Sequence, residues 1–332
     1  MELFSRVSRE DSMSEPGVPQ RFLELAAAAM APQQLSNEGL RARFGSPEEV
    51  RLAAGQVWRA CWEETSLLVL VLELATREVR AAPVTIDPPG EDAASLVVDG
   101  RRTVFGVETT VWAGLAGPVP TRVLDRVVDS WEPDLVAWAA ETAAGGTPSV
   151  PAGARQGVAP VSVFDASEDV RAVLEDDLEA LRMAPGLPAA EGSAKVVSLG
   201  ELLKGRLPDL PALGTALELS QPEVMRILRG STPLAPGQAE EVAKVTGLPV
   251  EAVAAAVRPL PPALAAAAEH PRWRQTWRSR AQRLGVSEGD ARLTGGYGAF
   301  ALAARETGGA DPDWEGRLRQ FLRGEDLAGS GT

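Results

Sequence analysis

The hydrophobic and polar positions change their spacing twice along the chain. In the first 54 residues the apolar positions have helical spacing. The runs that show it are QRFLELAAAAM (20–30), SNEGLRARFG (36–45) and SPEEVRLAAG (46–55). In the last run, Ser46 is a suitable N-cap and Pro47 a suitable first helical residue, and two glutamates follow at the positive helix end. We therefore expect residues 1–54 to be a helical segment.

Between residues 55 and 128 the apolar runs become short or alternating, and Gly, Pro, Asp and Glu separate them. These runs are GQVWRACW, SLLVLVLEL, EVRAAPVTI, ASLVVDG, TVFGVETTVWAGL and VPTRVLDRVV. They indicate five or six strands in a small antiparallel barrel or curled sheet. The next run, SWEPDLVAWAAETAAGG, predicts a short amphipathic helix that packs Trp131 and Trp138 against it. Residues 55–144 are thus predicted to be a small β-barrel domain with a trailing helix.

Residues 145–195 contain two linkers and an acidic helix. The stretches 145–160 and 184–193 are rich in Gly, Pro and Ala and have no burial pattern. Residues 167–183 predict a helix capped by Ser167, whose apolar face comprises Val170, Val173, Leu174, Leu178 and Leu181. Its other face carries Glu168, Asp169, Glu175, Asp176, Asp177 and Glu179. That acidic face is either simply solvated or binds a partner or a second copy of the chain.

Residues 196–258 predict four or five short helices with tight turns. Ser220 is a good N-cap for one of them, Pro222 is tolerated in its first turn, and Gly230 ends it. The spacing of Val224, Ile227 and Leu228 directs these side chains toward a hairpin core. The polar residues of the same helix are left to solvent.

The sequence Leu-x-x-Leu-Gly-x-Ala-Leu-x-Leu-Ser-Gln-x-x-Val-x-Arg-Ile-Leu-x-Gly of residues 210–230 resembles the helix-turn-helix of the XRE/Cro/C1 repressor family. The continuation STPLAPGQAEEVAKVTGLPVEAV is similar to the fourth and fifth helices of that family, so the resemblance covers residues 196–257. The family usually has Gly in the tight turn, where this chain has Glu218. A left-handed conformation costs a residue other than Gly on the order of 1 kcal/mol.

The resemblance implies binding to double-stranded DNA, commonly as a dimer on palindromic sites. The residues that we expect to contact DNA from this helix are Ser220, Gln221, Glu223, Arg226, Arg229 and Ser231. Gln pairs well with adenine and Arg with guanine in the major groove. Residues 196–258, however, hold six Lys/Arg against seven Asp/Glu, which is unfavourable for a DNA-binding domain acting alone. The alternative is a structural helix pair with ordinary exposed polar residues.

The run RWRQTWRSRAQR (272–283) in the C-terminal helical region 259–332 offers compensating charge, with five arginines and no acid. Helical spacing separates Trp273 and Trp277, expected in the core, from the arginines, expected outside. We consider two roles for these arginines equally. They contact the DNA backbone, for which the candidates are Arg272, Arg274 and Arg278, or they pair with the acidic helix at 168–179.

A second resemblance concerns the predicted barrel. Gly55–Trp58 and Ala82–Thr85 resemble the Gly-x-(Val/Ile)-Trp and Ala-Pro-(Val/Ile)-Thr strands of small SH3-like barrels of the PemK/MazF toxin type. The basic Arg-Pro element of those ribonucleases is replaced by SLLVLVLEL. We therefore expect a structural or partner-binding barrel rather than one that cleaves RNA.

Composition restricts the chemistry. The net charge of −13 argues against non-specific coating of nucleic acid, and a single cysteine suits the reducing cytoplasm. One histidine and one cysteine cannot supply a His/Cys metal site, and the common nucleotide, zinc-hydrolase and serine-hydrolase motifs are absent from the sequence. We expect no cofactor, no enzymatic activity and no membrane association. Cys61 is expected to be a buried structural thiol, and His270 a loop or helix-start residue.

The sequence thus predicts an α+β protein with N-terminal helices, a small antiparallel β-barrel, an all-α helix-turn-helix domain and a C-terminal helical domain. The function that it favours is that of a cytoplasmic bacterial transcription regulator, with the barrel sensing a partner or mediating assembly. The alternative is a protein-interaction or antitoxin-like scaffold subunit whose helix-turn-helix does not bind DNA.

Overall fold

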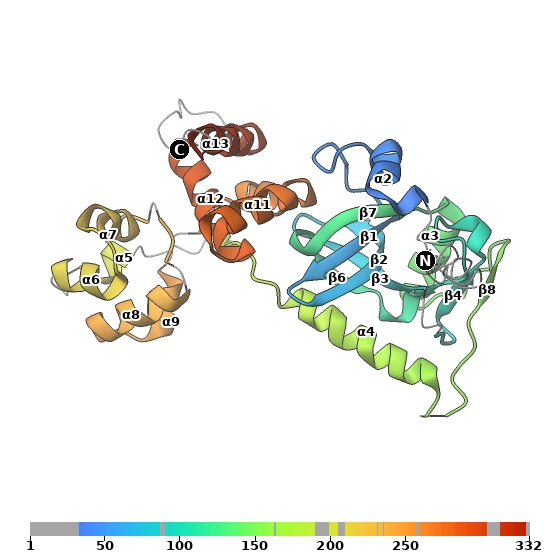
Figure 1. Cartoon of the computed structure of the whole chain (residues 1–332). Coiled ribbons are helices and arrows are strands. Elements are labelled where there is room, and N and C mark those ends of the chain that lie inside the picture. The colour runs from blue at the N-terminus through green and yellow to red at the C-terminus, as the bar shows by residue number, and fades with distance from the viewer. Residues whose placement is uncertain are drawn as a thin grey trace, which may run out of the picture.

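The computed structural model describes residues 33–86, 90–162, 164–189, 199–204, 210–230, 232–234, 236–256, 259–303 and 313–329. The helix predicted at residues 20–30 and the candidate DNA contact Ser231 lie outside these residues. Figure 1 shows a β-rich part, a group of short helices at the opposite end, and the C-terminal helices between them. The fold is therefore mixed helix and sheet, as the sequence predicts.

The described strands form an eight-stranded antiparallel sheet with the order β7-β1-β2-β3-β5-β4-β8, and β6 pairs with the other end of β3. Their bounds are Gln56–Trp62 (β1), Thr65–Leu74 (β2), Glu78–Thr85 (β3), Ser95–Val98 (β4), Thr109–Trp112 (β5), Gly117–Pro120 (β6), Leu124–Ser130 (β7) and Ala154–Gln156 (β8). The described strands form an open sheet, so the expectation of a closed barrel is wrong. Within the described sheet, the edge strands β7 and β8 stand at opposite ends of this order and do not pair with each other, and β3 divides its edge between β6 (Glu78–Ala81) and β5 (Val84 and Thr85).

Strand β2 is buried on both faces of the sheet. Leu67, Val69 and Val71 belong to one hydrophobic core, and Leu70 and Leu72 belong to the other. Burial on both faces explains why SLLVLVLEL is a continuous apolar run rather than an alternating one. This double burial also explains why a basic element is absent from this strand.

Two helices cover the two faces of the sheet (Figure 1). Helix α3 (Pro133–Ala143) covers one face. Trp131, just before it, and Trp138, within it, are 5% and 3% exposed and pack against the sheet, so the predicted packing of these indoles is confirmed. Helix α4 (Ala166–Arg182) covers the other face with Leu174, Leu178 and Leu181.

Two details of α4 differ from the prediction. Its N-cap is Asp165 rather than Ser167, because the Asp165 carboxylate accepts a hydrogen bond from the Ser167 backbone N–H at 3.0 Å. Val173, predicted on the apolar face, is 57% exposed. The buried stripe is therefore narrower than the sequence indicates.

The predicted helix at 46–55 is also wrong. The helix ahead of it, α2 (Asn37–Phe44), has Ser36 as its N-cap, but residues 47–49 form only a turn before an extended approach to β1. The Gln56 side chain holds this approach, since it accepts from Ala53 N–H at 2.9 Å and donates to the Arg51 carbonyl at 2.8 Å. The extended backbone places Val50 in the core beside Trp58.

Neither predicted linker is free of tertiary structure. The first contains β8, which pairs with β4 at the sheet edge. In the second, Leu187 is 5% exposed in the core of the C-terminal helices, and Ala189 forms a parallel bridge with Leu260. Both stretches carry so few apolar residues that their sequences show no periodic pattern.

The described helices beyond residue 198 bury two separate cores. The first group comprises α5 (Leu199–Leu202), α6 (Leu210–Leu217), α7 (Gln221–Leu228), α8 (Pro236–Thr246) and α9 (Val250–Ala255). The second comprises α10 (Pro262–Glu269), α11 (Arg274–Leu284), α12 (Glu288–Ala303) and α13 (Trp314–Gly329). Within the described residues, no helix has both the length and the apolar character needed to cross a membrane.

Candidate nucleic-acid interface

Helices α6 and α7 form a hairpin with an apolar inside and a polar outside. Val224, Ile227 and Leu228 are 0%, 4% and 6% exposed, which confirms their predicted inward orientation. They pack with Leu213 and Leu217 of α6. Gln221, Arg226 and Arg229 lie on the exposed side of α7.

The turn between the two helices is left-handed at Glu218, whose φ is +54°. The Leu219 N–H donates to the Gly214 carbonyl at 2.9 Å and closes the end of α6. A Cβ at Gly214 would lie 2.9 Å from the Leu219 carbonyl oxygen, so the close turn requires glycine at position 214. The residue with the left-handed backbone is therefore Glu218, at the position where the turn of the XRE/Cro/C1 family usually has glycine.

Ser220 and Glu223 cap the N-terminus of α7. The Ser220 backbone N–H donates to Glu223 Oε2 at 2.8 Å, and the Ser220 hydroxyl donates to the same oxygen at 2.5 Å. These hydrogen bonds lower the pKa of Glu223. Arg226 Nη2 lies 3.8 Å from Glu223 Oε1. Ser220 and Glu223, both predicted to contact DNA, are thus engaged with each other.

One flank of α7 borders the C-terminal helices. A cavity of about 380 Å³ lies between Glu223, Arg226 and Ile227 on one side and Val286, Asp290, Leu293 and Thr294 on the other. Gln221 and Arg229 are not part of its lining. A duplex would therefore have to approach α7 from the side that Gln221 and Arg229 occupy.

The arginines of α11 do not lie uniformly outside, as the sequence led us to expect. Arg274 is only 2% exposed, donates to the backbone carbonyls of Val123 and Cys61, and lies 3.4 Å from the Glu288 carboxylate. Arg280 is also buried, at 9% exposed. The helical period separates the indoles correctly, because Trp273 and Trp277 are 6% and 0% exposed. It does not reveal that α11 is covered on a second side by the sheet.

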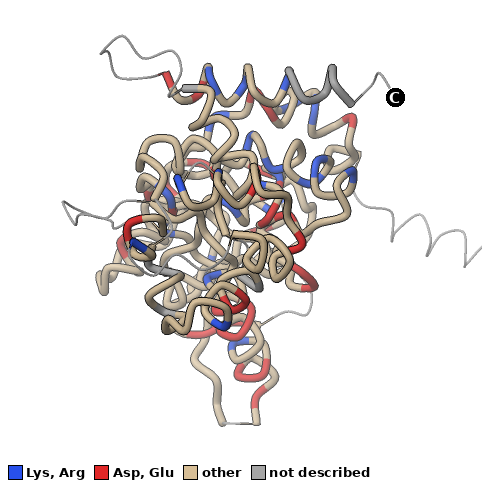
Figure 2. Tube along the Cα trace, turned by 90° about the vertical axis from the view of Figure 1, so that its left-hand side faces the viewer, with Lys and Arg blue, Asp and Glu red and all other residues tan. Residues whose placement is uncertain are grey.

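One of the two roles considered for these arginines, pairing with the acidic helix α4, does not occur within the described chain. Arg278 pairs with Asp125 at 2.8 Å and with Glu288 at 3.3 Å, and Arg272 pairs with Glu315. Figure 2 shows the acidic residues of α4 at the lower end of the molecule and the arginines of α11 and α13 in its upper half. The sheet lies between α4 and α11, so their charges do not meet.

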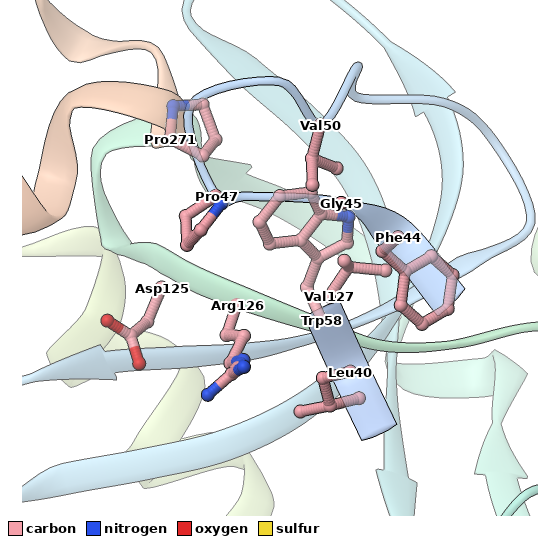
Figure 3. Close-up of a pocket in the computed structure, with 10 residues that line it drawn as sticks. All are labelled: Leu40, Phe44, Gly45, Pro47, Val50, Trp58, Asp125, Arg126, Val127 and Pro271. Atoms are coloured by element: carbon pink, nitrogen blue, oxygen red, sulfur yellow. The ribbon is translucent and has the colours of Figure 1, made fainter. Parts of the chain in front are cut away.

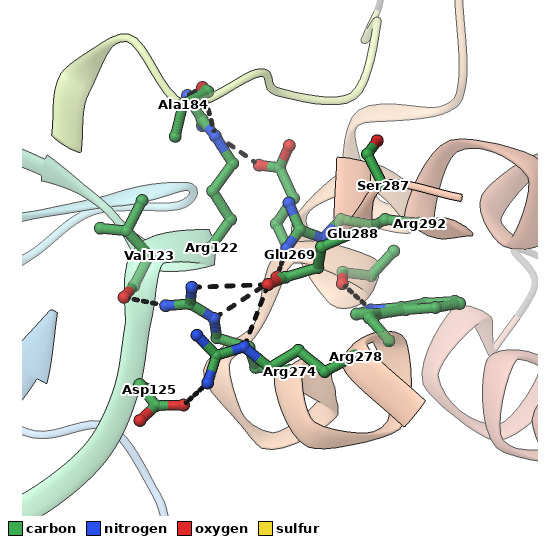
Figure 4. Close-up of polar contacts among 12 residues, drawn as sticks. Arg122, Val123, Asp125, Ala184, Glu269, Arg274, Arg278, Ser287, Glu288 and Arg292 are labelled. Atoms are coloured by element: carbon green, nitrogen blue, oxygen red, sulfur yellow. Dashed lines mark hydrogen bonds and ion pairs between the residues drawn. The ribbon is translucent and has the colours of Figure 1, made fainter. Parts of the chain in front are cut away.

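Arg274 and Arg278 of α11 instead belong to a network at the junction of the sheet and the C-terminal helices (Figure 4). Glu288 pairs with Arg274, Arg278 and Arg292, and Glu269 pairs with Arg77 and Arg122. Burial lowers the pKa of Arg292 to about 10, although Glu288 opposes the shift.

Burial raises the pKa of Asp125, but Arg59 and Arg278 outweigh it, so the net shift of this pKa is downward. Sequence inspection did not single out Asp125, Glu269 or Glu288. Their partners come from distant segments, and no local motif marks them.

The remaining candidates have structural positions. Cys61 is buried, as predicted, and its Sγ lies 3.9 Å from Arg278 Nη2. His270 follows α10, and its Nδ1 accepts a hydrogen bond from the Arg272 backbone N–H at 3.3 Å. Among the described residues, His, Cys, Asp and Glu side chains do not gather in any group of three or more that could hold a metal ion.

Comparison with known proteins adds no relative: no family model matches the chain, and no curated protein matches it. The resemblances to the XRE/Cro/C1 and PemK/MazF families therefore rest on the quoted sequence motifs alone.

Proposed function

We propose that this protein is a sequence-specific DNA-binding transcription regulator that inserts α7 into the major groove. The observation that supports this proposal is the α6–α7 hairpin. It buries Val224, Ile227 and Leu228 and leaves Gln221 and Arg229 exposed on the opposite side. That division is what a recognition helix requires, because one side must fix the helix and the other must contact base edges.

The chemistry of the exposed residues suits the proposed contacts. Gln221, in the first turn of α7, would pair with adenine. Arg226, five residues later, borders the flank that faces the C-terminal helices and would turn from Glu223 toward guanine. Arg229, at the C-cap, would hold a phosphate and so fix the register of the helix on the duplex. Arg274 is excluded from this role by its burial, and Arg272 and Arg278 are engaged in ion pairs.

We also propose how the whole chain would act on DNA. A second copy of the chain would place a second α7 one helical turn of DNA away, on a palindromic half-site. The acidic field of the whole chain, with its net charge of −13, would suppress binding to unrelated sequences. We place the protein in the cytoplasm because it has one cysteine, and we assign it no cofactor and no enzymatic activity.

A second candidate function is that of a protein-interaction subunit. The observation that favours it is the exposure of large apolar side chains in α4 and in the segment just before it: Val161 is 94% exposed, Phe164 is 91% exposed and Val173 is 57% exposed. Isolated exposed apolar residues are common, but neighbouring ones of this size often mark a contact surface.

Footprinting on the region upstream of the protein's own gene separates the two candidates. The full chain is compared with R226A/R229A and with the control R155A/R171A, which removes the same charge from exposed arginines far from α7. We expect protection at moderate salt with the wild type and the control, and its loss with R226A/R229A. Absence of protection with all three proteins would contradict DNA binding at that region, as would full protection by R226A/R229A.

A further inference from the structure

A polar groove opens where three separate parts of the chain meet. Its volume is about 300 Å³, and it lies between α2, strands β1 and β7, and α11. The residues that line it are Asn37, Arg41, Pro47, Arg59, Asp125, Arg126, Gln275, Arg278, Ser279 and Gln282. Small-molecule sites often lie at such junctions between structural units.

The groove concentrates positive charge in a chain that is strongly negative overall. Four arginines and one aspartate line it, whereas the whole chain has a net charge of −13. Asp125 is shared between Arg59 and Arg278, and Glu288 also pairs with Arg278, so the excess positive charge lies mainly on Arg41, Arg59 and Arg126. Arg41 is exposed and has no ion-pair partner among the described residues.

The guanidinium of Arg126 lies among like charges. Burial lowers its pKa, Arg59 and Arg41 lower it further, and Asp125 only partly opposes them. Arg126 donates to the Asn37 side-chain carbonyl and to the Asn37 backbone carbonyl, which fix its direction without neutralising it. An anion in the groove would relieve this repulsion.

The neutral residues of the groove add donors on its α11 side. Gln275, Ser279 and Gln282 recur along one exposed face of α11, at spacings of four and three residues. Amide and hydroxyl groups can donate to an oxyanion that the arginines hold. The arrangement therefore combines charge with hydrogen bonds from both walls.

The apolar space next to the groove is too small to hold part of a ligand. A small apolar pocket shares Pro47, Asp125 and Arg126 with the groove and contains the Trp58 indole (Figure 3). Its free volume is about 10 Å³, which is room for about one water molecule. An aromatic ring does not fit in that adjoining pocket, so the contacts available to a ligand are the charged and polar groups of the groove itself.

We propose that this groove binds a diphosphate group, either as free pyrophosphate or as part of a small molecule. Arginine guanidinium groups form paired, charge-assisted hydrogen bonds with phosphate oxygens, and several arginines can share the charge of one diphosphate. The groove has no role in the DNA contacts proposed for α7.

Ligand binding would also affect the junction between the sheet and the C-terminal helices. The groove takes Arg59 and Arg126 from the sheet and Arg278 from α11, so a bound diphosphate bridges the two. A ligand that binds only the docked arrangement stabilises it in proportion to its concentration. The melting temperature should therefore rise with pyrophosphate concentration.

Isothermal titration of the full chain with inorganic pyrophosphate, at constant ionic strength, tests the proposal. The variant R41Q/R126Q should weaken binding at least tenfold. The control R155Q/R171Q, which removes the same charge elsewhere, should leave binding within twofold. A titration with ADP distinguishes free pyrophosphate from a diphosphate that is part of a larger molecule. If ADP binds more tightly than pyrophosphate, the groove also contacts the ligand beyond its diphosphate.

A second variant keeps the test independent of the arginine contacts that hold the fold. Ser279 is exposed on α11, so S279E adds a negative charge to the groove at a solvent-facing position. It should abolish binding while the circular dichroism spectrum stays unchanged.

Three results would overturn the proposal: no pyrophosphate binding by the wild type, equal binding by R41Q/R126Q, or an equal loss in R155Q/R171Q. If R41Q/R126Q lowered DNA affinity while the wild type bound no pyrophosphate, the groove would be a DNA-backbone site instead. The pyrophosphate titration contains no DNA, so it stands apart from the test of α7.

Discussion

Arg77 and Glu269, which are 192 residues apart in the sequence, form a two-pronged ion pair. Arg77 Nε lies 2.7 Å from Glu269 Oε2, and Arg77 Nη2 lies 2.6 Å from Glu269 Oε1. The Glu269 side chain is fully buried and also accepts from the Leu187 backbone N–H at 2.6 Å. Glu269 ends α10, where the helix dipole disfavours an acid, so these donors are what make its charge tolerable. The pair joins the β2–β3 turn to the C-terminal helices.

Replacement of Glu269 should loosen this junction. We expect E269Q to lower the free energy of unfolding by about 3 kcal/mol, because Arg77 and Arg122 would keep buried charge without a carboxylate. Urea denaturation followed by tryptophan fluorescence measures this change. The matched control is E315Q, whose carboxylate pairs with Arg272 and Arg319 but is 46% exposed, and it should cost less than about 1 kcal/mol. Equal losses in both variants would contradict the role given to Glu269.

Arg274 should be a structural rather than a DNA-contacting residue. We expect R274M to lower the free energy of unfolding by about 3–5 kcal/mol, because it leaves the Val123 and Cys61 carbonyls without a donor and removes a partner of Glu288. Thermal and urea unfolding measure the loss. The control R283M changes an exposed arginine of the same helix and should cost less than about 1 kcal/mol. A stable R274M with weakened DNA binding would reverse this assignment.

Glu218 should be replaceable by glycine with a gain in stability. Its φ of +54° is unfavourable for a residue with a Cβ, so E218G is expected to raise the free energy of unfolding of the α5–α9 group by about 0.5–1 kcal/mol. The variant E218A separates the backbone effect from the charge effect, since alanine keeps the Cβ and loses the carboxylate. A gain with both variants would mean that charge, not conformation, is the cause.

His270 should remain neutral down to an unusually low pH. Burial and the neighbouring Arg272 together lower its pKa to about 4, although Glu315 opposes the shift. Because the folded-state pKa lies below the unfolded value of about 6.5, the stabilisation from neutral His270 is complete above pH 6.5. It is lost as the pH falls from about 6.5 toward 4. The chain has a single histidine, so an NMR titration of its ring protons reports this pKa without ambiguity.

The variant H270N provides the control for the thermodynamic effect. Asparagine keeps an acceptor for the Arg272 N–H but does not titrate. Relative to H270N, the wild type should lose on the order of 2 kcal/mol of stability between pH 6.5 and pH 4, less than the full shift implies because the ring is partly exposed. A ring pKa near 6.5 in the folded protein would contradict the prediction.

Local patterns in the sequence correctly predicted those features that depend on residues close together in the chain. The apolar runs between residues 55 and 128 correspond to strands, and the residues of α7 face inward and outward as their spacing indicates. The same logic failed at residues 46–55, where good helix-start residues are followed by an extended backbone because Val50 packs beside Trp58. Tertiary packing overrode local preference there.

The sequence alone therefore determined the mixture of helix and sheet and the two sides of α7. These depend on interactions within a few residues, whose geometry is set by the backbone period. Only the tertiary structure decided that the sheet is open, that Arg274 is buried, and that Arg41, Arg59, Arg126 and Arg278 meet in one groove. Those features depend on pairings between segments far apart in the chain. The spacing of residues within one segment does not predict which distant segment will pack against it.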